Sequence, residues 1–217
     1  MAHFIYLHGF ASSPRSTKAV FFREHLARLG HTVVVADLEE GDFQGLTITR
    51  QLAVVRREIA RTSGDLTLIG SSRGGYLATL AAAEEPRIGR LVLLAPAIDM
   101  KARWAVRYGA EQLARWKAKG VAPTFHHAHG EERLIGYALY EDLDRYDPAP
   151  PVRVPTLAFM GRQDETVSPA AVERWAGQNP SVRLRWLDSG HELVDALETI
   201  WSESAAFLGI AGGAATP

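Results

Sequence analysis

A short apolar run that breaks into glycines around a serine carries the main chemical signal of this sequence. The run covers residues 65–69, and the segment Gly70-Ser71-Ser72-Arg73-Gly74 follows it directly. This segment fits the G-x-S-x-G pattern of a nucleophile elbow, in which small residues allow a strained turn to hold a serine hydroxyl above a sheet. An alanine-rich stretch then predicts a helix. Ser72, rather than Ser71, is therefore the candidate nucleophile.

A serine hydroxyl needs two partners before it can attack an ester. An imidazole must accept its proton, and a carboxylate must fix the tautomer of that imidazole and stabilise its cation. Asp164 and His191 follow Ser72 in the order that this kind of elbow requires, each just after an expected strand. Three other acidic residues remain alternatives for the carboxylate: Glu165, Asp188 and Glu192.

The oxyanion of the tetrahedral intermediate requires fixed main-chain donors, and loss of one such donor typically raises the barrier by about 2.7–4 kcal/mol. We expect these donors to be the amide of Arg73, next to the nucleophile, and the amide of Phe10, in the loop after the first strand. Ala11 is an alternative to Phe10. Four side chains are expected in the substrate pocket: Ala11, Trp104, Tyr137 and Val167.

The elements that position these residues alternate between strand and helix. Apolar runs predict six strands, near residues 4–7, 31–37, 65–69, 91–96, 156–160 and 182–187. The run 31–37 is apolar on both sides of the pleat, which predicts a strand covered on both faces. The alternation indicates an α/β protein with a doubly wound, mostly parallel sheet of about six strands. The carboxyl ends of such strands meet at one edge, where ligands bind.

The alternation breaks between residues 98 and 151, where a hairpin is expected around Gly130. We interpret this long excursion as an inserted lid beside the binding site, the alternative being a structural insertion away from the substrate. The predicted domains are a core of residues 1–97 and 152–210, a lid of residues 98–151, and a flexible tail of residues 211–217.

Composition excludes several other functions. The 217 residues include 24 basic and 25 acidic residues and no cysteine. Because the charges nearly balance, no strong positive electrostatic field is expected that would attract nucleic acid or an anionic membrane. Because there is no cysteine, thiol catalysis and cysteine-ligated zinc are excluded. The first apolar run is too short for a signal peptide or a membrane span. We expect a cytoplasmic protein without nucleic-acid or membrane partners, either a monomer or a homodimer.

The remaining motifs predict no cofactor and no metal. A dinucleotide-binding turn would need a glycine where Ser72 stands. His127 and His129 share a face of the expected hairpin, but no third metal ligand is placed beside them. His8 is expected to shape its loop, because a second imidazole has no catalytic role to fill.

Two motifs resemble those of a known superfamily. Residues 6–14, YLHGFASSP, and residues 70–76, GSSRGGY, are similar to motifs of the small bacterial YqiA-like esterases of the α/β-hydrolase superfamily. The likeness covers most of the chain outside residues 98–151. It implies an α/β-hydrolase fold that lacks the first two N-terminal strands, a triad of Ser72, Asp164 and His191, and short acyl esters or thioesters as substrates.

Two features depart from that resemblance. Arg73 stands where leucine or methionine is usual. Residues 97–104 and the following hairpin instead resemble lidded feruloyl-type and other carboxylesterases. The sequence thus predicts a cofactor-free serine carboxylesterase (EC 3.1.1-like) that cleaves small acyl or aryl esters through an acyl-serine. A thioesterase or amidase with the same triad, and a ligand-binding protein without turnover, are the alternatives.

Overall fold

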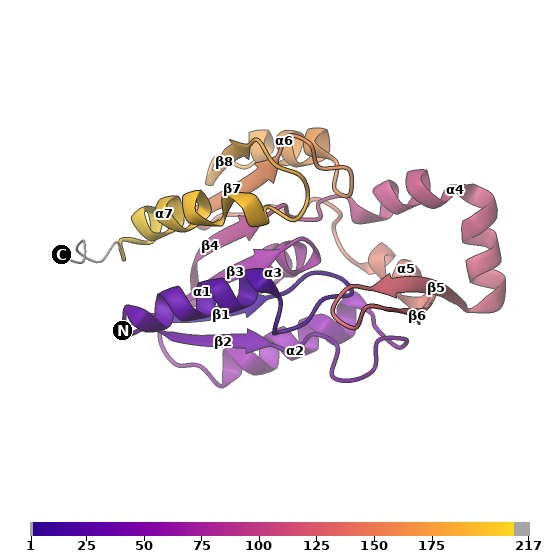
Figure 1. Ribbon diagram of the computed structural model, residues 1–217, viewed down its shortest axis with the longest axis horizontal. Coiled ribbons are helices and arrows are strands. Elements are labelled where there is room, and N and C mark those ends of the chain that lie inside the picture. Colours follow the sequence, from indigo (N-terminus) through magenta and orange to yellow (C-terminus); the bar gives the residue numbers. More distant parts are fainter. Residues whose placement is uncertain (1, 211–217) are drawn as a thin grey trace.

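A six-stranded sheet forms the centre of the molecule (Figure 1). The structure, a computed structural model, describes residues 2–210. Its strands are β1 (His3–Leu7), β2 (Thr32–Ala36), β3 (Leu66–Ser71), β4 (Ile88–Leu94), β7 (Thr156–Gly161) and β8 (Val182–Leu187). They lie in the order β2-β1-β3-β4-β7-β8, and every neighbouring pair is parallel. The predicted parallel α/β architecture is confirmed.

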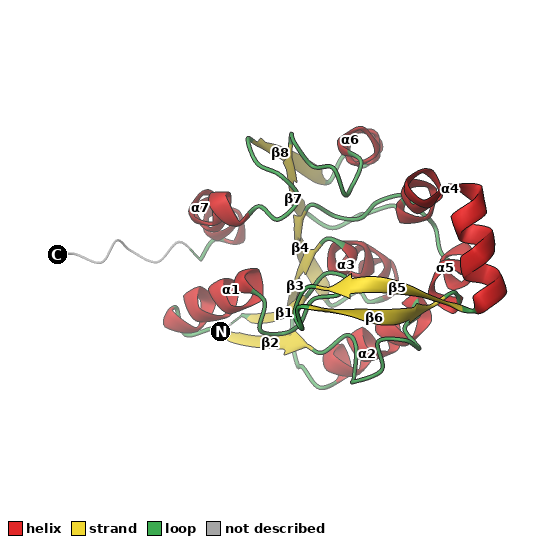
Figure 2. Cartoon of the chain, turned by 45° about the vertical axis from the view of Figure 1, so that its right-hand side comes forward, coloured by secondary structure: helices red, strands yellow, loops and turns green. Residues whose placement is uncertain are grey.

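Helices cover both faces of this sheet. They are α1 (Thr17–Arg28), α2 (Ile48–Ala60), α3 (Arg73–Glu84), α6 (Pro169–Gln178) and α7 (Leu197–Leu208), with the short 3-10 helix η2 (Val194–Ala196) before α7. Figure 2 shows α1 and α7 on one face and α2, α3 and α6 on the other. The sheet is therefore doubly wound. In the part of the chain described, no helix has the length and apolar character needed to cross a membrane.

The second strand has a helix on each face, α1 on one and α2 on the other, as expected, but this cover is partial. β2 pairs only with β1 and lies at the edge of the sheet. Its residue Thr32 is exposed, residues 33–35 are half-buried, and Ala36 is buried. By contrast, all residues of β3 and β7 are buried. A run of β-branched residues fits any partly covered pleat, so it does not tell a central strand from an edge strand.

Residues 98–151, which we call the insertion, leave the sheet after β4 and return before β7. They contain α4 (Met100–Lys119), the antiparallel strands β5 (Val121–His126) and β6 (Glu131–Gly136), α5 (Ala138–Asp142) and the 3-10 helix η1 (Leu143–Arg145). The predicted hairpin is confirmed. α4 bends at Gly109, whose φ of 69° and ψ of 163° are not helical. Figure 1 shows the insertion beyond the end of the sheet toward which β2 points.

Several contacts hold the insertion against the core. The amide of Gly136 donates to the carbonyl of Gln44 at 2.9 Å. The carboxylate of Asp142 accepts from the amide and the hydroxyl of Thr49, at 2.7 and 2.8 Å. These bonds fix β6 and α5 against the loop after β2 and the start of α2. The predicted flexible tail, residues 211–217, lies outside the described residues.

Candidate active site

Ser72 sits in a strained turn between β3 and α3. Its backbone has φ of 51° and ψ of −116°, a conformation that a non-glycine residue rarely adopts. A Cβ atom on Gly70 would lie 2.5 Å from the carbonyl oxygen of Gly74, and one on Gly74 would lie 2.1 Å from that of Leu7. Only glycine fits at these two positions. The sequence motif therefore folds as the tight elbow that it predicts.

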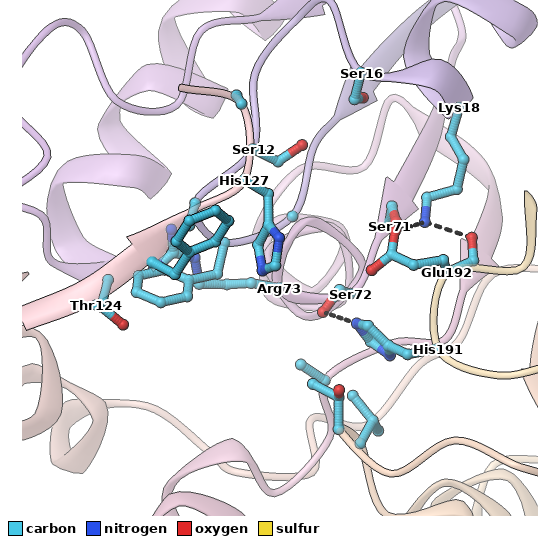
Figure 3. Close-up of a pocket in the computed structure, with 18 of the residues that line it drawn as sticks. Ser12, Ser16, Lys18, Ser71, Ser72, Arg73, Thr124, His127, His191 and Glu192 are labelled. Atoms are coloured by element: carbon cyan, nitrogen blue, oxygen red, sulfur yellow. Dashed lines mark hydrogen bonds and ion pairs between the residues drawn. The ribbon is translucent and has the colours of Figure 1, made fainter. Parts of the chain in front are cut away.

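Three side chains from distant parts of the chain meet at this turn. The hydroxyl of Ser72 is 3.1 Å from Nε2 of His191, a contact that Figure 3 marks with a dashed line. Nδ1 of His191 lies 2.8 Å from Oδ2 of Asp164. Since a carboxylate only accepts hydrogen bonds, Nδ1 carries the proton and Nε2 is free to accept one from Ser72. The arrangement can move a proton from the hydroxyl to the imidazole.

The loops after β7 and β8 place the acid and the base. Oδ1 of Asp164 accepts hydrogen bonds from the amides of Thr166 and Val167, both at 2.8 Å. A Cβ atom on Gly161 would lie 2.4 Å from the carbonyl oxygen of Ser189, so glycine lets these two loops pack directly together. The side chain of Asp164 is fully buried, and its charge is therefore little screened by water.

The three alternative carboxylates have other environments. Asp188 accepts a hydrogen bond from the side chain of Gln163 at 2.6 Å. Glu192 pairs with Lys18 at 3.1 Å, and Glu165 is exposed. Asp164 is therefore the carboxylate that is hydrogen-bonded to His191.

The loop after β1 lies against the nucleophile. A Cβ atom on Gly9 would be 3.4 Å from Cβ of Ser72. Arg73 is the first residue of α3, so its amide has no partner inside the helix. The amide of Phe10 donates to no acceptor among the described residues. Both predicted oxyanion donors thus lie beside Ser72, and Ala11, the alternative to Phe10, also lines the cavity there.

A cavity of about 830 Å³ opens above Ser72 and His191, between the core and the insertion. Ala11, Trp104 and Val167 line it. The expectation that Tyr137 lines this pocket is wrong. Its ring packs edge-on against Trp116 at a centroid distance of 5.4 Å, and neither of these two rings lines the cavity. A tyrosine in an aromatic-rich segment fits a core as well as a pocket wall.

Arg73 is an unusual buried cation. Its side chain is fully buried, and its three guanidinium nitrogens have no hydrogen-bond partner among the described residues. The guanidinium lies over the ring of Phe10, 4.5 Å from the ring centroid. Burial lowers the pKa of Arg73 to about 9, so the group still carries its charge at neutral pH.

His8 holds the loop that carries Phe10. Its Nε2 accepts from the amide of Leu38 at 3.2 Å, and its Nδ1 donates to the carbonyl of Gly9 at 3.0 Å. Burial lowers the pKa of His8 to about 4, so the ring is neutral at pH 7. These bonds agree with the predicted loop-shaping role.

One cluster has the donor set of a metal site. Glu39, His126 and His129 offer ligand atoms that lie within 4.8 Å of one another. Two imidazoles and a carboxylate suit zinc. However, Nε2 of His126 already bonds both oxygens of Glu39, at 2.9 and 3.1 Å, which accounts for the cluster without an ion. His127, expected on the same face of the hairpin as His129, is not part of this cluster and points into the cavity near Ser72 (Figure 3), which His129 also lines.

Lys18 is a site residue that the sequence reasoning missed. Its amine donates to the main-chain oxygen of Glu192 at 2.6 Å and pairs with the carboxylate of the same residue (Figure 3). It thereby holds the loop directly after His191. The sequence carries a partial signal, because Lys18 lies next to Ala19 and one turn before Phe22, on the apolar side of the predicted helix, and the structure buries it there. A lysine on the core side of a helix needs a partner.

Comparison with known proteins identifies a family and a fold. The family model described as "Uncharacterised protein family (UPF0227)" matches residues 3–208. No curated protein matches the sequence significantly. The fold is similar to that of the alpha/beta hydrolase domain-containing protein 10 from mouse, with a TM-score of 0.81, 21% identity, and coverage of 96% of this chain and 90% of that chain.

Two esterases are also similar in fold. Est1E from Butyrivibrio proteoclasticus, in a structure with bound ferulic acid, gives a TM-score of 0.75 at 21% identity, covering 95% of this chain and 90% of that chain. The Pyrococcus furiosus esterase Pf2001 gives 0.68 at 20% identity, covering 96% and 82%. These likenesses show that the chain has the α/β-hydrolase fold.

Proposed function

The chain belongs to the UPF0227 family, and from this premise we propose that it is a serine hydrolase that cleaves carboxylic esters through an acyl-Ser72 intermediate. One observation carries the proposal: the continuous hydrogen-bond chain from Ser72 through His191 to Asp164, at 3.1 and 2.8 Å. A nucleophile, a base and an orienting carboxylate in this geometry are the requirements of nucleophilic acyl transfer.

In the first half of the reaction, Oγ of Ser72 attacks the ester carbonyl carbon while Nε2 of His191 takes the hydroxyl proton. The amides of Arg73 and Phe10 bind the resulting oxyanion. When the tetrahedral intermediate collapses, the bond to the alcohol oxygen breaks, and His191 gives its proton to that oxygen. The alcohol leaves, and the acyl group remains on Ser72.

In the second half, water attacks the acyl carbon and His191 takes a proton from the water. Collapse breaks the bond to Oγ of Ser72, which regains a proton from His191 as the carboxylic acid leaves. Asp164 stabilises the imidazolium in both halves. The insertion acts as a lid that shapes the pocket through Trp104, which lines the cavity.

A panel of p-nitrophenyl acetate, butyrate and octanoate, a butyryl thioester and a p-nitroanilide tests the proposal. Wild-type protein is expected to hydrolyse the esters, and Ser72→Ala to lose roughly 10⁴-fold or more in kcat. Ser204→Ala is the matched control, because Ser204 is buried on α7 and does not line the cavity. Full ester turnover by Ser72→Ala would refute the proposal, and faster thioester or anilide turnover would reassign the class to thioesterase or amidase.

A further inference from the structure

The cavity above Ser72 carries an excess of positive charge. Among the described residues that line it, Glu192 is the one acidic residue, whereas five are basic: Arg15, Lys18, Arg73, Arg103 and Arg107. The whole chain, with 24 basic and 25 acidic residues, is nearly neutral. The excess is therefore a local property of the cavity and not of the surface in general.

The protein itself compensates little of this charge. Lys18 pairs with Glu192 and is neutralised. Arg103 donates to the main-chain oxygens of Glu165 and Thr166, which bear no formal charge. Arg15 and Arg107 are exposed and form no ion pair with any residue that the structure describes.

The buried Arg73 adds to the field of the cavity. Its guanidinium has no hydrogen-bond partner among residues 2–210, and the carboxylate of Glu39 stabilises its charge only from a distance. A charge that is removed from water is weakly screened by salt, so it acts over a longer distance than an exposed charge. An anion in the cavity would experience attraction from Arg73 even without direct contact.

The wall of the cavity also has an apolar part, which includes Phe10, Ile98, Met100 and Val167. Arg103 and Arg107 lie one turn apart on α4 and so project from the same side of that helix. A guanidinium offers a planar fork of donors that matches a carboxylate or a phosphate. The cavity thus has one region suited to an acyl chain or an aryl ring, and another suited to an anion.

We infer that the natural substrate is an anionic ester, with a carboxylate or phosphate that binds the arginines of the cavity wall while its apolar part lies beside Ser72. This inference rests on the proposed hydrolase function and names the substrate class of the same site. Arg107 and Arg15 are the expected anion ligands, because both are exposed and unpaired in the described structure. Arg103, on the same helix as Arg107, adds a further positive charge beside these two ligands.

Matched esters test the inference. On the alcohol side, 3-carboxyphenyl butyrate and 3-phosphonooxyphenyl butyrate are compared with the neutral 3-carbamoylphenyl butyrate. On the acyl side, mono-p-nitrophenyl glutarate is compared with p-nitrophenyl glutaramate, in which a neutral amide replaces the free carboxylate. Wild-type protein is expected to prefer the anionic member of at least one comparison by roughly tenfold in kcat/KM at low salt, and the preference should shrink as salt is added.

Substitution of the unpaired arginines should remove that preference. Arg15→Gln combined with Arg107→Gln is expected to lower the ratio of anionic to neutral kcat/KM by roughly three- to tenfold. Arg90→Gln is the matched control, because Arg90 is exposed on β4 outside the cavity, and it should leave the ratio unchanged. Equal turnover of charged and neutral esters by wild-type protein would overturn the inference. Failure to hydrolyse any ester, neutral ones included, would instead overturn the proposed function.

Discussion

Asp164→Asn separates the orienting role of the carboxylate from its shape. Asn is nearly isosteric with Asp, and its amide oxygen can replace Oδ1, which accepts from the amides of Thr166 and Val167. Its NH₂ group must then face Nδ1 of His191, where the carboxylate oxygen lay at 2.8 Å. Because NH₂ only donates, it selects the tautomer with the proton on Nε2. That nitrogen can no longer accept the proton of Ser72.

The expected cost is large. The wrong tautomer and the lost charge beside the imidazolium together reduce kcat by about 10⁴-fold in a triad of this kind. At 1.36 kcal/mol per tenfold, this equals about 5.5 kcal/mol of transition-state stabilisation. The measurement is steady-state hydrolysis of p-nitrophenyl butyrate, together with a thermal unfolding curve that shows the variant to be folded.

Asp188→Asn is the matched control, since the carboxylate of Asp188 contacts Gln163 and lies outside the triad. It should keep wild-type kcat. If Asp164→Asn retained kcat within tenfold of wild type, or if Asp188→Asn lost as much as Asp164→Asn, the assignment of the acid would be refuted.

Three further predictions concern two buried titratable side chains and the loop that follows His191. Burial lowers the pKa of His8 from 6.5 to about 4. Between these two pH values the unfolded chain binds a proton on His8 that the folded protein does not bind. The free energy of unfolding should therefore fall by up to about 3 kcal/mol as the pH is lowered from 6.5 to 4. Urea unfolding at pH 7 and 4.5 should show a smaller fall for His8→Gln, and an equal fall would contradict this reasoning. Arg73→Met should stabilise the fold by roughly 1–4 kcal/mol, because it removes an unpaired buried cation, and a lower Tm than wild type would argue against that. Lys18→Met should lower kcat more than it raises KM, because Lys18 holds the loop after His191, and unchanged kinetics would show that this contact is dispensable.

The sequence predicted the sheet and the elbow well because each depends on local patterns. The glycines around Ser72 are required by contacts of 2.1 to 2.5 Å that any side chain would make with the backbone. Parallel strands bring their carboxyl ends to one edge, so the positions of Asp164 and His191 after β7 and β8 follow from the chain order. The motif and the chain order were therefore enough to predict these features.

The sequence was less informative where packing decides the outcome. β2 and β3 are both apolar runs, and only the strand order places β2 at an edge. In the insertion, Trp104 reaches the cavity whereas Tyr137 packs on Trp116, because the bend of α4 at Gly109 and the fold of the hairpin decide which rings meet. No periodicity in the sequence encodes that arrangement.

The basic residues around the cavity, other than Arg73, also escaped prediction. Lys18, 174 positions before Glu192, is joined to it only in the folded chain. Arg103 and Arg107 lie in a stretch of the sequence with many charges, and they line a cavity only because the fold places α4 beside Ser72. Long-range electrostatics of this kind depends on the three-dimensional arrangement and not on spacing.

Covalent labelling tests the central claim most directly. A fluorophosphonate reacts with a serine only where a base activates the hydroxyl and donors stabilise the developing charge on the probe. Wild-type protein treated with the probe, digested and analysed by mass spectrometry should carry one adduct, on Ser72, and Asp164→Asn should label much more slowly. Absence of labelling, or an adduct on another residue with Ser72 unmodified, would contradict the account.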